Sequence, residues 1–146
     1  MDDRKGREFF AANLDRHVEA EGRILEEYRA LSEKIANGPV GMLVDLILTE
    51  EEQHHFLLRA MAKHLRQSPA GGTKGLEAEE AVRDELLRQT QRLRGHERET
   101  IGACRDLKSQ LSSEEKELFE ALLDAMILDS EKHERLLLAI EKMIRA

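Results

Sequence analysis

Residues 49–58 read Thr-Glu-Glu-Glu-Gln-His-His-Phe-Leu-Leu, three carboxylates followed at once by two imidazoles. Residues three apart share a helix face, so Glu51 can be presented together with His54, and Glu52 together with His55. The apolar positions around the stretch follow the first face, whereas the second face continues into an arginine that belongs in water. These apolar positions are Val40, Val44, Ile47, Leu58 and Leu65. We therefore predict that Glu51 and His54 point inward, where a bound metal ion is one way to compensate the charge.

The composition is typical of a helical bundle. Charged residues make up 36% of the 146 residues and aromatic residues 3%, with two prolines, and the length suits a single domain over residues 1–146. A net charge of −7 argues against nucleic acid or an anionic membrane as partner, and no apolar run reaches membrane-spanning length. One cysteine, Cys104, cannot form an intramolecular disulfide, so we expect a reducing, cytoplasmic location. Its helical spacing from Ile101 and Leu107 predicts that Cys104 is a small, buried core residue.

Helical periodicity divides the chain into four long segments. It predicts helices over about 3–36, 39–67, 76–111 and 112–145. Asn37-Gly38-Pro39 separates the first two, with glycine past a helix end and proline opening the next helix. Ser112 as N-cap, with Glu115 reaching back, predicts a capping box at the start of the fourth. Four helices of similar length predict an all-α four-helix bundle.

The second half of the chain repeats the first. Residues 44–65, moved forward by 79 positions, align with residues 123–144 at seven identical residues, and His54 meets His133. The identical residues of the first half are Asp45, Glu52, His54, Leu57, Leu58, Ala60 and Lys63. The inward faces of the first and third helices each carry one acid, Glu21 and Glu97. Counted from the short turns, the heights of these residues agree to within about two helical turns, so we predict that the side chains converge.

One Glu from each of two helices, with His-bearing motifs on the other two, resembles the ferritin-like di-iron and di-manganese carboxylate proteins, and most closely the rubrerythrin-like domain. The resemblance implies an antiparallel bundle with a crossover between the second and third helices. It implies iron or manganese, up to two ions per chain, with oxidase or peroxidase-type redox activity. It makes Glu21 and Glu97 terminal carboxylates, Glu51 a bridging carboxylate, and His54 and His133 imidazole ligands. Carboxylate and imidazole ligands suit these metals.

The sequence departs from the family pattern at one ligand. Ser130, three residues before His133, stands where the family has its second bridging glutamate. Asp129 lies on nearly the same face, and we expect it to ligate directly or through water; otherwise the second metal is weak or absent. The chain also has no Cys-x-x-Cys pair, so the rubredoxin-type iron domain of full rubrerythrins is not expected.

The crossover sets a length requirement. The linker-like residues 68–75 reach at most about 28 Å when extended, less than the ~43 Å length of the second helix. We therefore predict that part of residues 76–83 joins the crossover and that the packed third helix begins nearer Asp84.

Two other functions stay open. A Glu-x-x-His pair arises easily among 30 acidic residues and six histidines, so the chain is alternatively a non-catalytic helical bundle, an interaction or structural module with a degenerate metal site. Iron binding without turnover is the third reading. Metal content separates the first two readings, and peroxide consumption by the loaded protein separates the third. Exposed apolar flanks on long helices also favour a homodimer.

Overall fold

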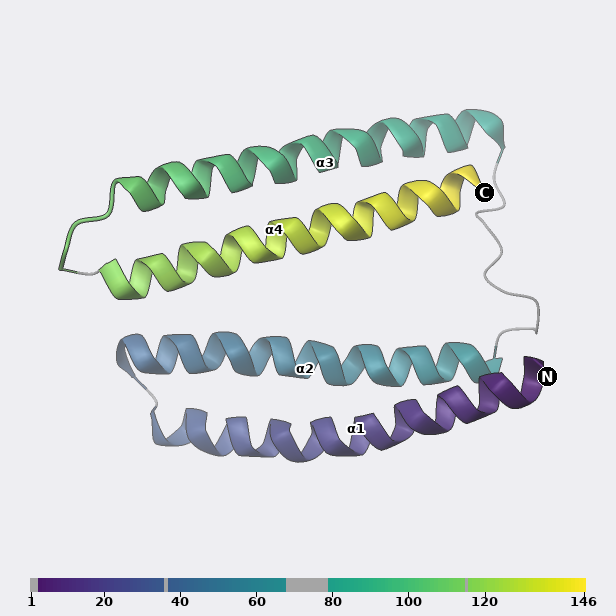
Figure 1. Ribbon diagram of the computed structural model, residues 1–146, viewed down its shortest axis with the longest axis horizontal. Helices are drawn as coiled ribbons and strands as arrows, with labels where there is room; N and C mark the ends of the chain where they lie inside the picture. Colours follow the sequence, from purple (N-terminus) through teal and green to yellow (C-terminus); the bar gives the residue numbers. More distant parts are fainter. Residues whose placement is uncertain (1–2, 36, 68–78, 115) are drawn as a thin grey trace. The chain divides into compact units, whose positions relative to one another are not determined.

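The computed structural model describes residues 3–35, 37–67, 79–114 and 116–146, and all regular secondary structure within these ranges is helical (Figure 1). The helices are α1 (Asp3–Lys34), α2 (Gly38–Gln67), α3 (Glu80–Ser109) and α4 (Lys116–Arg145). The prediction of an all-α protein with four long helices is confirmed. Across the described ranges, no helix combines the length and the apolar character needed to cross a membrane.

The chain divides into two compact units, Met1–Gly72 and Thr73–Ala146, each holding two helices. The first unit is a hairpin of α1 and α2. Near its turn the Ser32 hydroxyl donates to Asp45 at 2.5 Å, and at its open end Arg7 donates to the Leu65 carbonyl at 3.1 Å. The two helices therefore run in opposite directions. Gly38, with φ of 88°, takes the left-handed conformation that the reversal requires and that glycine adopts without strain.

The second unit is a hairpin of α3 and α4. Lys108 pairs with Asp124 at 2.5 Å near its turn, and Arg94 pairs with Glu141 at 2.8 Å towards its open end. Its helices also run in opposite directions. That the two hairpins together make one domain stays a prediction.

In each hairpin the least exposed positions recur every three or four residues, the spacing by which two helices of a coiled coil meet. We call these positions the seam. The seam of the first hairpin holds Ala11, Leu14, Val18, Glu21, Leu25 and Tyr28, facing Gly41, Val44, Leu48, Glu51, His55, Leu58 and Ala62. That of the second holds Thr90, Arg94, Glu97, Ile101 and Cys104, facing Leu123, Ile127, Ser130, Glu134, Leu137, Glu141 and Ile144. The predicted burial of Cys104 is confirmed.

Part of the predicted inward stripe lies beside the seam instead of in it. Val40 and Ile47 are 58% and 41% exposed. Helical periodicity places them with other exposed apolar residues on one side of the hairpin, which we call its apolar flank. The first flank holds Phe10, Ile24, Leu31, Val40, Ile47, Leu57 and Met61; the second holds Leu93, Leu107, Phe119, Met126, Leu136, Ile140 and Met143. The apolar face predicted from the sequence is therefore wider than the face that one partner helix buries.

Two predicted helix starts were wrong. The third helix begins at Glu80 and not at Leu76, and the preceding residue Glu79 has an extended backbone. The fourth begins at Lys116, so Ser112 is not its N-cap. Gln110 and Leu111 donate back to the carbonyls of α3, and the chain needs the following residues to reverse direction. The linker residues 68–75 and the capping residue Glu115 lie outside the described residues.

Candidate metal site

The seam of the first hairpin brings together the three predicted ligands of that half. Glu21 of α1, Glu51 of α2 and His54 of α2 each offer a ligand atom, and these atoms all lie within 4.8 Å of one another. The Nδ1 atom of His54 is 3.8 Å from Oε1 of Glu51. Glu21 and Glu51 occupy facing seam positions, whereas His54 lies one helical turn from Glu51 on the apolar flank. Its side chain is accordingly 53% exposed, against 20% for Glu51.

The carboxyl group of Glu21 opposes the ionisation of Glu51. A hydrogen bond to Glu21 raises the pKa of Glu51, partial burial and the negative charge of Glu21 raise it further, and His54 acts weakly in the other direction. Two carboxyl groups in such contact need a proton or a cation between them to avoid repulsion. Among the described residues, the Oε2 atom of Glu21 is buried and has no hydrogen-bond partner. This carboxyl oxygen is therefore available to a ligand.

The sequence interpretation missed His55. It assigned this residue to the solvent face, but His55 is half-buried in the seam. Its Nε2 atom would lie 3.7 Å from a Cβ atom on Gly22, so the absence of a side chain at Gly22 gives the imidazole room. The spacing of seven residues from Leu48 to His55 and on to Ala62 is the signal that could have found it.

The second hairpin brings together Glu97 and His133. The Nδ1 atom of His133 is 3.4 Å from Oε1 of Glu97. Ser130 is buried in the seam beside them. Asp129, expected to replace the missing glutamate, pairs with Lys132 at 3.3 Å. Its role as a ligand stays a prediction, as does the convergence of Glu97 and His133 with the group in the first hairpin.

Two carboxylates in the second seam, Glu134 and Glu141, are neutralised by arginines of the same hairpin. Glu134, the counterpart of His55 under the 79-residue repeat, accepts from Arg98 at 2.6 Å and lies 4.0 Å from Arg94. Glu141 accepts from Gln91 at 3.3 Å, Arg145 at 3.2 Å and Arg94 at 2.8 Å, and these hydrogen bonds lower the pKa of Glu141. In the first seam, the charges of described residues that shift the pKa of Glu51 are those of Glu21 and His54, with no arginine or lysine among them.

Comparisons with protein-family models, with curated proteins and with solved structures each find no match for this chain. A function can therefore be inferred only from the arrangement of the side chains. Two carboxylates and one imidazole form a donor set that suits iron and manganese. With both carboxylates ionised, the site carries two negative charges that a divalent cation would balance.

Proposed function

We propose that the chain binds an iron or manganese ion through Glu21, Glu51 and His54. The observation that carries the proposal is the facing pair of carboxyl groups in the first seam, with an imidazole beside them. Such a pair is unfavourable when both groups are ionised, and a divalent cation converts the repulsion into attraction. If these carboxylates served only to stabilise the hairpin, arginine partners like those of Glu134 and Glu141 in the second seam would stabilise it better.

The residues fit the proposed ion on two further counts. The buried Oε2 atom of Glu21 has no hydrogen-bond partner among the described residues, which leaves it available as a ligand. The donor set of Glu21, Glu51 and His54 also contains no thiolate; the single cysteine, Cys104, belongs to the second hairpin. Oxygen and nitrogen donors without sulfur favour iron or manganese over softer ions.

We propose further that the hairpins pair through their apolar flanks as an antiparallel four-helix bundle with a crossover between α2 and α3. Two features support this. The flanks correspond under the 79-residue repeat, Ile47 to Met126 and Met61 to Ile140, and each is apolar although exposed. His54 and His133 occupy corresponding flank positions. Pairing through the flanks would bury both imidazoles and bring Glu97 and His133 to the first group.

This assembly would complete a centre like that of the ferritin-like carboxylate proteins that the sequence resembles. The bound metal would supply a redox centre for oxidation by oxygen or peroxide, the activity that the resemblance implies. The chain's own residues would hold the ion, and the apolar flanks would exclude bulk water from it. Ser130 removes one anionic donor, so two ions of unequal occupancy, or one ion alone, are expected.

Elemental analysis tests the proposal. Full-length protein from cells supplied with iron and manganese should carry at least one ion per chain. Glu51→Gln combined with His54→Gln should remove most of it. The matched control, His96→Gln combined with Glu99→Gln, changes the same residue types at the same spacing on an exposed face of α3 and should keep the metal.

The control pair also separates the rival function. If neither double variant changes metal content, the chain holds these polar residues for packing or for a partner, as an interaction or structural module would. The exposed apolar flanks are the observation that favours that alternative. In metal-loaded wild-type protein, consumption of peroxide would distinguish a redox enzyme from a protein that only binds iron.

A further inference from the structure

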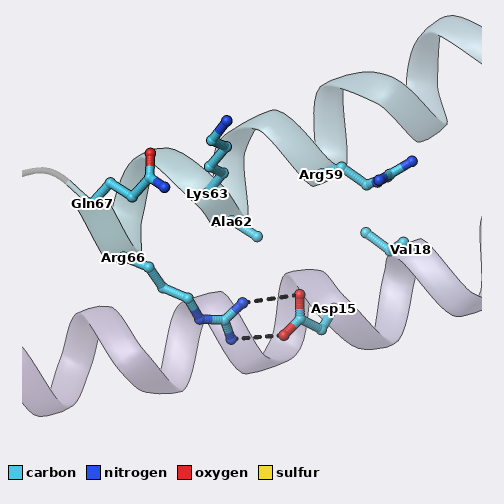
Figure 2. A pocket seen from close by; sticks show the side chains of 7 residues that line it. All are labelled: Asp15, Val18, Arg59, Ala62, Lys63, Arg66 and Gln67. Carbon is cyan, nitrogen blue, oxygen red and sulfur yellow. Dashed lines mark hydrogen bonds and ion pairs between the residues drawn. The ribbon is translucent and has the colours of Figure 1, made fainter.

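Apart from the candidate metal site, the first hairpin has a groove on the side away from its apolar flank. A groove of about 360 Å³ runs between α1 and α2 towards the open end of the hairpin (Figure 2). Its floor is apolar and small, formed by Val18 and Ala62. Its remaining lining residues are polar or charged: Asp15, Arg59, Lys63, Arg66 and Gln67.

The charges of the groove do not balance. Three cations and one carboxylate line it, so its net charge is +2, in a chain whose net charge is −7. Arg66 is held in place by Asp15, which accepts two hydrogen bonds at 2.7 and 3.3 Å, and it also lies 3.5 Å from Glu8 outside the groove. Arg59 and Lys63 make no hydrogen bond or ion pair with any residue that the structure describes. Two cations are therefore available to a ligand.

The repeat shows how the chain fills the corresponding place in its other half. Under the shift of 79 positions, Ala62 corresponds to Glu141 and Arg66 to Arg145. Glu141 places a carboxylate in the second seam, where it accepts from Arg145 at 3.2 Å and Arg94 at 2.8 Å. In the first hairpin the residue at this position is a small alanine, and the cations beside it face open space. In the first hairpin the carboxylate among the groove's lining residues, Asp15, pairs with Arg66, which leaves Arg59 and Lys63 without a partner among the described residues.

We propose that the groove bounded by Arg59, Lys63 and Arg66 binds a small polyvalent oxyanion of the phosphate class. Guanidinium and ammonium groups recognise phosphate oxygens through charge-assisted hydrogen bonds, and arginine can do so with two parallel bonds. The chain's net charge of −7 disfavours a nucleic acid, whose backbone carries one negative charge per phosphate.

Isothermal titration of the full-length chain with inorganic pyrophosphate tests this site. Wild-type protein should bind one pyrophosphate per chain with a saturable isotherm. Arg59→Gln combined with Lys63→Gln should weaken binding by roughly tenfold or more, since each removes a charged hydrogen-bond donor. The matched control is Arg135→Gln combined with Lys142→Gln on α4, which removes the same charge from the other hairpin and should leave binding unchanged.

Three results would overturn the proposal: no saturable binding by wild-type protein, equal affinity in the Arg59/Lys63 variant, or an equal loss in the control, which would indicate only general charge attraction. A phosphate group can also arrive on a lipid. Sedimentation with vesicles containing phosphatidic acid distinguishes this source. Binding to vesicles that is lost in the Arg59/Lys63 variant but kept in the control would assign the lipid headgroup. Absence of vesicle binding with intact pyrophosphate binding would assign the free anion.

Discussion

The two hairpins share one framework and treat buried charge in opposite ways. Both have a seam with coiled-coil spacing, an apolar flank, and a glutamate on the first helix near a histidine on the second. In the second hairpin, arginines inside the hairpin neutralise Glu134 and Glu141. In the first, Glu21 faces another carboxyl group, and the groove cations Arg59 and Lys63 lack partners among the described residues. The second hairpin thus neutralises two of its seam carboxylates with its own arginines, whereas the first hairpin places two carboxyl groups against each other.

The largest expected effect comes from the hydrophobic part of the seams. Leu25 and Ile101 lie four residues after Glu21 and Glu97, and both are buried. Leu25→Ala and Ile101→Ala should each lower the free energy of unfolding by about 2–5 kcal/mol, because each leaves a cavity. Calorimetry should show one shared transition for both variants if the hairpins form one bundle. Two separate transitions, each sensitive to only one substitution, would contradict the pairing of the hairpins.

The apolar flank gives the next test of that pairing. Ile47→Lys should cost about 1.5–3 kcal/mol if Ile47 is buried between hairpins, since that is the value of burying such a side chain. Phe56→Lys is the control, because Phe56 is 69% exposed on the outer face of α2, and it should change stability by less than about 0.5 kcal/mol. Urea denaturation measures both. Equal small effects would show that the flank stays in water.

Ser130→Glu should make the second seam resemble the first. The new carboxylate would face Glu97, near His133, and without metal it should lower stability by about 1–3 kcal/mol, the usual cost of a buried polar group that lacks a partner. With iron or manganese, stability should recover and the metal content should rise towards two ions per chain. Ser130→Gln, of equal size and no charge, should not gain metal. A Ser130→Glu protein with unchanged metal stoichiometry would contradict the equivalence of the two seams.

Asp129→Ala should lower the metal content measured by elemental analysis if Asp129 is a partial ligand.

A smaller effect is expected from the internal neutralisation of the second hairpin. Hydrogen bonds from Gln91, Arg145 and Arg94 lower the pKa of Glu141 below its ordinary 4.5. The folded state therefore binds a proton less readily than the unfolded chain, so this carboxylate contributes stability above pH 4.5 that is lost as the pH falls through its folded pKa. Glu141→Gln should melt at a lower temperature than wild type at neutral pH and lose less on acidification. Parallel melting curves from pH 7 to about pH 3 would contradict this role.

Much of the fold was predictable from sequence because it depends on periodicity. The four helices, the turn at Gly38 and the burial of Cys104 follow from apolar spacing and from the chemistry of single residues. The helix starts at Glu80 and Lys116 were missed because they depend on where packing ends, which periodicity does not encode. The facing of Glu21 and Glu51 was correctly expected from their inward positions.

The remaining features of the site depend on the rotation of each helix about its axis. A stripe such as Val40, Ile47 and Leu58 spans two adjacent faces, so the sequence could not separate the seam from the flank. For the same reason it placed His55 in solvent and His54 in the core, whereas His55 lies in the seam and His54 on the flank. The groove at Arg59 was missed because it requires knowing which α1 residues lie opposite α2.

Locating a bound ion tests the central claim most directly. Crystals grown with iron or manganese should be measured at the absorption edge of the supplied metal, where an anomalous difference peak identifies the ion. We expect a peak within ligand distance of the carboxylates of Glu21 and Glu51 and of the imidazole of His54, stronger than any peak beside Ser130. Well-ordered Glu21 and Glu51 side chains hydrogen-bonded to each other, with no anomalous peak between them at saturating metal, would contradict it.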